Sequence, residues 1–368
     1  MAARHPACGA MLGKIPVPAR IGTASLASIW PDRAVQMAQS EATVFFGPVI
    51  LNPPAIPSVS HMPSLPNSPM GGPDSAGTSP DLRFVNVFSA GPNGGNPAPV
   101  VFDADALSSD EMKAIAARYG HESAFVCRAV DSRHTWRLRF FVPAHEMEMC
   151  GHATLGAMWL LREAGRWTSA KATVETLSGI VDVRFDEETR RIDVGQPRGI
   201  VEPIDDPQLI ESICDVLRIS PDDLSPLGIV NARTSRTKTL IPLRSVEALN
   251  ALNPALNGVA ALCDALDSTG LYPIAVERTQ PLELHARQFP RASGYPEDAA
   301  TGIAAAATLY GAIHYRWLTG NDSTMRVYQG FAMGRPSCIR VALRKPGEGS
   351  AGCWISGAVE FAMLEPHA

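Results

Sequence analysis

The alternation of apolar and polar positions along the chain predicts a series of short strands. Residues 83–88 (Arg-Phe-Val-Asn-Val-Phe) alternate as a strand does when one face is buried, and residues 91–97 have the glycine, asparagine and proline content of a turn. Residues 135–141 form a second strand-like run before Pro143. By the same criteria, strands are predicted at residues 99–102, 124–127, 171–194 (three strands), 238–243, 271–276, 284–289, 325–328, 337–343 and 352–361.

Helical segments lie between these strands, and the first is marked at both ends. Ser108 followed by Glu111 is a capping-box signature, and Gly120 is a typical helix stop. Because helices and strands intermix without strict βαβ alternation, the predicted fold class is α+β. Further helices are predicted at residues 153–164, 207–218 and 246–252, and residues 297–302 open an alanine-rich helix that continues to about residue 313.

The first 82 residues differ from the rest of the chain. They contain 13 of the 31 prolines, and proline removes the backbone donor that helices and sheets need. We interpret residues 1–82 as a disordered or loosely attached proline-rich extension without a catalytic role. A transit peptide and a true start at Met62 or Met70 are the alternatives.

Composition and charge narrow the function classes. The 368 residues carry a formal net charge of -5, which leaves no basic field for a nucleic-acid backbone. No apolar run approaches the ~18 residues of a membrane span. The seven cysteines include no C-x-x-C pair, which argues against a disulfide scaffold and fits a reducing cytosol. We therefore expect a cytoplasmic protein with neither nucleic acid nor membrane as a partner.

Two loops in the chain correspond to each other. Residues 150–154 (Cys-Gly-His-Ala-Thr) follow a strand and a proline and precede a helix, and so do residues 298–302 (Asp-Ala-Ala-Thr-Gly). A helix N-terminus presents free backbone N–H groups that suit a carboxylate or an enolate. Two such ends facing each other would hold a small anion, although two unrelated loops remain the alternative.

Glu122 is the first candidate for chemistry. It directly follows the helix stop and precedes an apolar strand. Partial desolvation there would raise the pKa of its carboxyl group toward the range useful to a general acid/base. The alternative is an ordinary solvated glutamate.

The densest group of potential metal ligands lies in residues 145–152. In an extended segment, Glu146, Glu148, Cys150 and His152 would share one face. No established metal-ligand spacing is present, however, and Gly151 favours a turn, so no metal is predicted.

Cys150 and Asp298 each stand at a predicted helix start. A helix N-terminus lowers the pKa of a thiol, so Cys150 could act as a thiolate acid/base. A two-thiol racemase would need a partner cysteine, and the corresponding position in the second half is Ala299. Asp298 could cap the alanine-rich helix and still point toward a ligand. No nucleotide-binding loop and no G-x-S-x-G elbow occurs in the sequence.

Read together, several motifs resemble the PhzF family of phenazine-biosynthesis isomerases. The resemblance runs in order from about residue 83 to residue 364. The motifs are Gly-Asn-Pro at 95–97, His-Glu-Ser-Ala-Phe at 121–125, Arg-Phe-Phe-Val-Pro at 139–143 with Glu146, Cys-Gly-His-Ala-Thr at 150–154, Glu-Asp-Ala-Ala-Thr-Gly at 297–302, and Gln-Gly at 329–330 with Gly-Arg-Pro-Ser at 334–337.

The resemblance implies a diaminopimelate-epimerase-like fold with two similar halves, residues 83–200 and 201–368, and an active site between them. Each half would be a curled sheet around a central helix. It also implies a homodimer and a reaction without metal or cofactor, in which a small carboxylated, dihydro-hydroxyanthranilate-like substrate is isomerised, in secondary-metabolite biosynthesis. A glutamate moves a proton between two ring carbons on one face, and the enol formed then becomes a ketone.

By motif match, the resemblance also implies the site residues. The base would be Glu122, with His152 and Asp298 as the other catalytic residues, and the substrate-binding residues would be Gly151, Thr301, Gly302 and Ile303.

This chain departs from the family pattern at two positions. Ala299 stands where the family usually has proline, and Ile303 where it usually has a serine whose hydroxyl can bind the substrate's carboxylate. Loss of such a donor changes specificity more than reaction class. Two alternatives to the isomerase stay open: a racemase or epimerase that depends on Cys150, and a non-catalytic binding protein that uses the same cleft.

Overall fold

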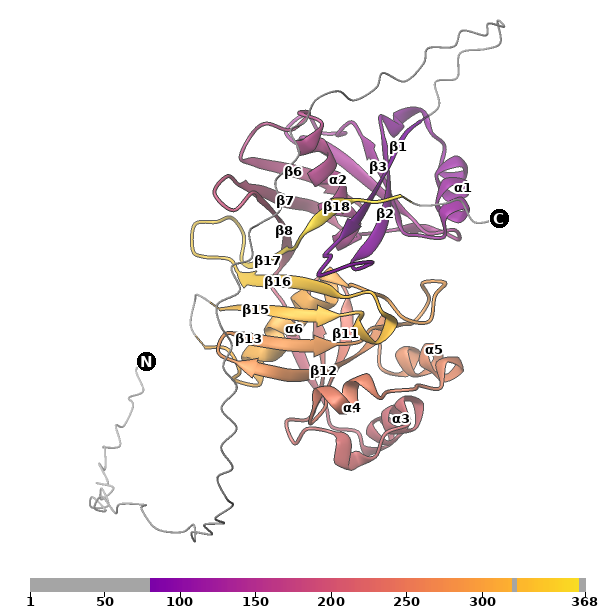
Figure 1. The fold of residues 1–368 in the computed structure, drawn as a ribbon, viewed down its shortest axis with the longest axis vertical. Coiled ribbons are helices and arrows are strands. Elements are labelled where there is room, and N and C mark those ends of the chain that lie inside the picture. The colour runs from indigo at the N-terminus through magenta and orange to yellow at the C-terminus, as the bar shows by residue number, and fades with distance from the viewer. Residues whose placement is uncertain (1–79, 320–322, 364–368) are drawn as a thin grey trace, which may run out of the picture. The chain divides into compact units, whose positions relative to one another are not determined.

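The computed structural model describes residues 80–319 and 323–363 (Figure 1). Apart from its last three positions, the predicted proline-rich extension lies outside the described residues. The strands are β1 Asp81–Val87, β2 Asn96–Phe102, β3 Ser123–Cys127, β4 Trp136–Phe141, β5 Glu146–Met147, β6 Lys171–Thr176, β7 Gly179–Asp186, β8 Arg191–Pro197, β9 Ile200–Ile204, β10 Ile229–Arg233, β11 Thr237–Pro242, β12 Gly270–Thr279, β13 Leu282–Ala286, β14 Phe289–Pro290, β15 Thr324–Gln329, β16 Ser337–Leu343, β17 Gly352–Ser356 and β18 Val359–Phe361.

The helices intermix with these strands as predicted. The capping box at Ser108 and the left-handed Gly120 bound the first helix. The α-helices are α1 Ser109–Tyr119, α2 Gly151–Glu163, α3 Pro207–Leu217, α4 Val246–Asn250, α5 Leu256–Ala265 and α6 Gly302–His314, and 3₁₀ turns lie at Ala104–Ala106, Pro221–Asp223 and Phe331–Met333.

Two helices of equal length, α2 and α6, occupy the centres of the two halves (Figure 1). Strands β1, β2, β3, β8 and β18 pack against α2, and strands β9, β10, β11, β15, β16 and β17 pack against α6. Both helices are apolar on nearly all sides, which is typical of a helix enclosed by the protein. Small residues allow the close packing: a Cβ at Gly156 of α2 would lie 2.8 Å from Val85 Cγ2 of β1.

Strand pairing links the two halves. The described strands form one connected pairing network. In it, β17 pairs antiparallel with β8, and the C-terminal strand β18 pairs with β1 near the beginning of the described chain. The two central helices are therefore held in one continuous framework.

The predicted strand at residues 284–289 is interrupted. Its two parts, β13 and β14, both pair with β12, and the amide of Arg287 between them still donates to the carbonyl of Pro273. Proline has no N–H to return the second ladder bond, so the pairing breaks there. The predicted strand at 352–361 is likewise divided into β17 and β18, at Gly357.

Four strands and α-helices of the described residues were not predicted: β5, β9, β10 and α5. Strand β9 contains a proline and has no buried residue, so it lacks the alternation of a half-buried strand. Helix α5 begins after Ala255, whose side chain forms no capping hydrogen bond, so the usual start signal is missing.

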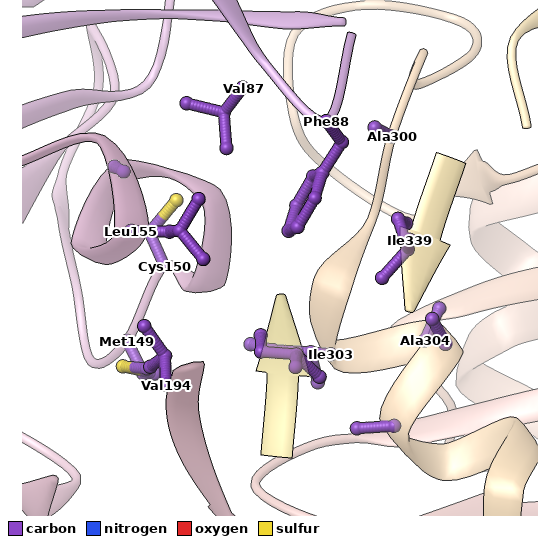
Figure 2. Close-up of a cluster of buried hydrophobic side chains, with 14 of the residues drawn as sticks. Val87, Phe88, Met149, Cys150, Leu155, Val194, Ala300, Ile303, Ala304 and Ile339 are labelled. Atoms are coloured by element: carbon purple, nitrogen blue, oxygen red, sulfur yellow. The ribbon is translucent and has the colours of Figure 1, made fainter. Parts of the chain in front are cut away.

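An apolar cluster lies where the two central helices begin. Figure 2 shows Cys150 and Leu155 at the start of α2, Ile303 and Ala304 at the start of α6, and the ring of Phe88 between them. Phe88 is fully buried and Ile303 is 7% exposed.

Across the described ranges, no helix is both long enough and apolar enough to cross a membrane.

Candidate active site

The first residues of α2 and α6 approach the same side chain. A Cβ at Gly151 would lie 3.1 Å from Ile355 Cδ1, and a Cβ at Gly302 would lie 2.8 Å from the same atom. Neither cap residue, Cys150 or Thr301, bonds the helix with its side chain. Two N-termini with free backbone N–H groups therefore converge on one place, as the internal correspondence predicted.

A cavity of about 60 Å³ opens at these helix starts. It is smaller than the roughly 300–1,000 Å³ of typical ligand pockets, so its walls must separate to admit a ring-sized molecule. All seven residues that the sequence placed in the site line it: Glu122, Gly151, His152, Asp298, Thr301, Gly302 and Ile303.

Glu122 is largely buried and has a partner on each oxygen. Its side chain is 11% exposed. The Cys150 thiol donates to Oε2 at 2.9 Å, and the Tyr295 hydroxyl donates to Oε1 at 3.0 Å. The carboxylate is thus held at the cavity by two donors, and the solvated surface glutamate considered as the alternative does not describe it.

Cys150 is a thiol rather than a thiolate. Burial raises its pKa well above the ordinary value, and the Glu122 carboxylate raises it further. The expectation that the helix N-terminus lowers this pKa is wrong, because desolvation and the adjacent negative charge outweigh the helix dipole. The proton stays on sulfur and serves as the hydrogen-bond donor to Glu122.

His152 completes this group at the start of α2. Its Nδ1 lies 3.3 Å from Cys150 Sγ and 3.8 Å from Glu122 Oε2. The ring is buried, and Nε2 has no hydrogen-bond partner among the described residues. A buried imidazole nitrogen without a partner is free to bind a polar group of a ligand in the cavity.

The extended segment that would have put Glu146, Glu148, Cys150 and His152 on one face, which the sequence analysis considered and did not favour, does not form. Only residues 146–147 are a strand, and the chain enters α2 at Gly151. Glu146 forms a bidentate ion pair with Arg139 (2.8 and 2.7 Å), and Glu148 is exposed. In the described ranges, potential ligand atoms within 4.8 Å of one another belong instead to Glu122, Cys150 and His152. Glu122 and His152 both already contact the Cys150 thiol.

Asp298 connects the two halves and does not cap α6. The cap residue is Thr301, and Asp298 lies three positions earlier. Its carboxyl group accepts from Asn96 Nδ2 at 2.6 Å and from Thr301 Oγ1 at 2.5 Å. Burial raises the pKa of Asp298 to about 6, with a further contribution from the charge of Glu122. Asp298 is therefore poised to exchange a proton near neutral pH.

The position that corresponds to Cys150 is occupied by Thr301. Each is the residue before the first residue of its helix, whereas Ala299 does not line the cavity. No second cysteine of the described chain lines the cavity. The cavity therefore offers no second thiol for a two-thiol racemase. The residue equivalent to Cys150 in the second half is Thr301, and not Ala299 as the sequence analysis expected.

Ile303 closes the cavity with an apolar side chain. A Cβ on Gly151 would lie 3.7 Å from Ile303 Cγ1, so the side chain bridges the two helix starts. It lines the cavity without a side-chain donor, and only the backbone of this residue can bind an anion.

Sequence reasoning assigned no role to several polar residues at this site. Tyr295 and Lys238 line the cavity, and Asn96 of β2 donates to Asp298, which also lines it. Gln329 supports the loop before α6, since its Nε2 donates to the carbonyl of Asp298 at 2.7 Å. Asn96 and Gln329 stand in the quoted motifs, whereas nothing in the local sequence of Tyr295 or Lys238 indicates that these residues line the cavity.

The arrangement of two helices that begin at one cavity defines a class of protein. A hydroxyproline epimerase structure from Agrobacterium vitis is similar to this chain with a TM-score of 0.52 at 12% identity, over 78% of this chain and 90% of that one. A Bacillus anthracis phenazine biosynthesis protein of the PhzF family gives a TM-score of 0.68 at 25% identity, over 78% and 98%. The fold is therefore the predicted diaminopimelate-epimerase-like α+β fold.

The family follows from the sequence comparison. Residues 85–362 match the family model PhzC-PhzF, described as phenazine biosynthesis-like protein. The uncharacterized isomerase YddE of Escherichia coli O157:H7 is 32% identical over 76% of this chain and 95% of its own length. The trans-2,3-dihydro-3-hydroxyanthranilate isomerase of Pseudomonas aeruginosa is 28% identical over 74% and 94%. The chain belongs to the PhzC-PhzF family and is an isomerase.

Proposed function

We propose that the protein isomerises a small carboxylated, dihydro-hydroxyanthranilate-like substrate by moving a proton with Glu122. The observation that carries this proposal is a mostly buried carboxylate, oriented by Cys150 and Tyr295, at a cavity where two helix N-termini meet. The named activity of the Pseudomonas relative supports the substrate class. The side chains at the site supply the acid/base chemistry.

Glu122 acts as both base and acid in this proposal. Each carboxylate oxygen accepts one hydrogen bond and keeps a second lone pair. A substrate C–H bond that reaches one of these lone pairs can transfer its proton to Glu122, which returns it to another carbon on the same face. The enol left behind then becomes the ketone. One base is sufficient for a same-face shift, so a second thiol is not needed.

His152 and Asp298 hold the reacting molecule. The unpartnered Nε2 of His152 can bond to a substrate oxygen or nitrogen, and Asp298 can give or accept a proton near its pKa of about 6. The free N–H groups at Gly151 and Gly302 suit the substrate's carboxylate, since a helix N-terminus favours an anion. Ile303 and Thr301 shape the wall around that carboxylate.

The test is turnover in deuterated buffer followed by proton NMR. We expect the wild type to convert trans-2,3-dihydro-3-hydroxyanthranilate and Glu122→Gln to be slower by about 10²–10⁴, the usual contribution of a general base. Glu148→Gln is the matched control, because Glu148 is exposed and does not line the cavity. Full turnover by Glu122→Gln would contradict the proposal. Thermal stabilisation by the substrate without any proton exchange would favour the binding-protein alternative.

A further inference from the structure

The cavity has a basic side that the proton shift does not use. Lys238 of β11 lines it and is only 6% exposed. No ion pair or hydrogen bond joins its ammonium group to any described residue. A buried cation without a partner is costly, so its presence at a cavity calls for a ligand.

Arg236 adds a second positive charge to the same wall. It immediately precedes β11 and is two residues from Lys238 in the chain. Arg236 also lines the cavity, and no described residue pairs with its guanidinium group. Two unpaired cations, two residues apart in the chain, therefore line the same cavity as Glu122 and Asp298.

Gln288 supplies a neutral donor and acceptor beside these cations. It is 1% exposed, and neither its Nε2 nor its Oε1 has a hydrogen-bond partner among the described residues. Its backbone carbonyl accepts from the amide of Asp298 at 3.0 Å, which fixes Gln288 next to Asp298. The side chain fits because residue 270 is glycine: a Cβ there would lie 2.0 Å from Gln288 Nε2. A fully buried amide with both atoms free indicates a missing polar partner.

The cations do not serve as ion-pair partners for the two carboxylates. Glu122 is bonded by Cys150 and Tyr295, and Asp298 by Asn96 and Thr301. Lys238 interacts with the two carboxylates through charge at longer range only. Its positive group is thus available to an anion that enters the cavity.

We propose that Lys238, Arg236 and Gln288 form a subsite for a second carboxylate, which makes the substrate a small dicarboxylic acid. This proposal rests on the proposed function, which places the first carboxylate at the starts of α2 and α6. A substrate with one carboxylate leaves the basic subsite empty, so we expect the anthranilate-type compound to be a slower substrate than a dicarboxylate of similar size.

The test compares rigid probes that differ in one carboxylate. Binding of fumarate is measured against crotonate, and of trans,trans-muconate against sorbate, by calorimetry at pH 7; in each pair a methyl group replaces one carboxylate. We expect at least one dicarboxylate to bind the wild type about tenfold or more tightly than its partner, the effect of one charge-assisted contact. Two dicarboxylate lengths are used so that one of them can match the separation between the basic subsite and the helix starts.

Variants identify the subsite. We expect Lys238→Met to abolish the dicarboxylate preference and leave crotonate and sorbate affinity unchanged, Lys238→Arg to retain part of the preference, and Gln288→Leu to reduce it severalfold. Lys171→Met is the control, since Lys171 is exposed and does not line this cavity. Two results would overturn the proposal. One is that the wild type binds the dicarboxylate and the monocarboxylate of each pair with equal affinity. The other is that Lys238→Met lowers the affinity for both members of a pair by the same factor.

The outcome is separable from that of the proposed function. Binding of these probes requires no proton transfer, so Glu122→Gln should keep the dicarboxylate preference. A preference that depends on Lys238, together with no isomerisation by the wild type, would contradict the proposed function alone. Isomerisation that depends on Glu122, together with no dicarboxylate preference, would contradict the subsite alone.

Discussion

The hydroxyl of Tyr295 donates a hydrogen bond of 3.0 Å to Oε1 of Glu122, a residue 173 positions earlier in the chain. Burial raises the pKa of Tyr295 well above its ordinary value, so the phenol stays protonated and remains a donor. The contact engages the carboxylate oxygen that Cys150 does not bind. It also joins the loop before α6 to the segment between α1 and β3, and so links the two halves at Glu122.

Tyr295→Phe should therefore lower kcat about tenfold with little change in KM. Loss of one orienting hydrogen bond is worth about 1–1.5 kcal/mol, which corresponds to that factor in rate. Steady-state kinetics of the variant provides the measurement. A larger rise in KM than fall in kcat would assign Tyr295 to substrate binding and contradict a role in orienting Glu122.

Cys150 should tolerate serine better than alanine. The buried thiol is protonated and donates to Glu122, and a serine hydroxyl can donate in its place. We expect Cys150→Ser to stay within about tenfold of wild-type turnover and Cys150→Ala to lose more. The racemase alternative makes the opposite prediction, because there the sulfur itself carries the proton and serine would abolish activity.

Because the buried Asp298 carboxyl group ionises as the pH rises, the free energy of unfolding should decrease. Its pKa is about 6 in the fold against 3.8 for the unstructured group, so the native state holds the proton more tightly. Stability from this group is complete below the unfolded pKa and is lost as the pH rises through the folded one. Between pH 4.5 and 7.5 the loss is about 2 kcal/mol.

Urea unfolding at these two pH values measures this effect. The stability of Asp298→Asn relative to the wild type should increase from pH 4.5 to pH 7.5 by that amount, because the amide does not titrate. The Glu122→Gln background provides the control: the increase should be smaller there, since the charge of Glu122 contributes to the raised pKa. If the difference in the free energy of unfolding between Asp298→Asn and the wild type were the same at both pH values, burial would not raise the pKa of Asp298.

Gly302→Ala should destabilise the fold by about 1–3 kcal/mol, the usual cost of overpacking. The new Cβ would lie 2.8 Å from Ile355 Cδ1 and 3.3 Å from Phe88 Cζ, both in the core between the helix starts. Ile355→Val removes the first of these atoms. In a double-mutant cycle measured by denaturant unfolding, the pair should be more stable than the sum of the two single effects. Additive effects would mean that the helix starts are less closely packed than described.

Local patterns predicted the helices and the location of the site better than the chemistry within it. The α1 boundaries depend on Ser108, Glu111 and Gly120, whose contacts lie within one helix, and the prediction was confirmed. The Cys150 pKa was predicted from the helix N-terminus alone, yet its direction is set by burial and by Glu122. That carboxylate lies 28 positions away in the chain. A local signal cannot show which of two opposing effects is larger.

Asp298 illustrates the same limit. Aspartate near a helix start usually caps it, but Asn96 binds this carboxyl group from a strand 202 positions away. Lys238 and Gln288 look like ordinary strand and loop residues in the sequence. Only the folding together of β11, the β13–β14 break and the two helix starts makes them neighbours of one cavity.

In the proposed mechanism one base, Glu122, carries a proton between two carbons on the same face. The most direct measurement is the isotope content of the product formed in deuterated water during early turnover, determined by proton NMR and mass spectrometry. A single base in a cavity of about 60 Å³ exchanges slowly with solvent, so part of the original protium should appear at the new carbon. Complete deuteration at that carbon from the first turnovers, with Glu122→Gln as active as the wild type, would contradict proton transfer by Glu122.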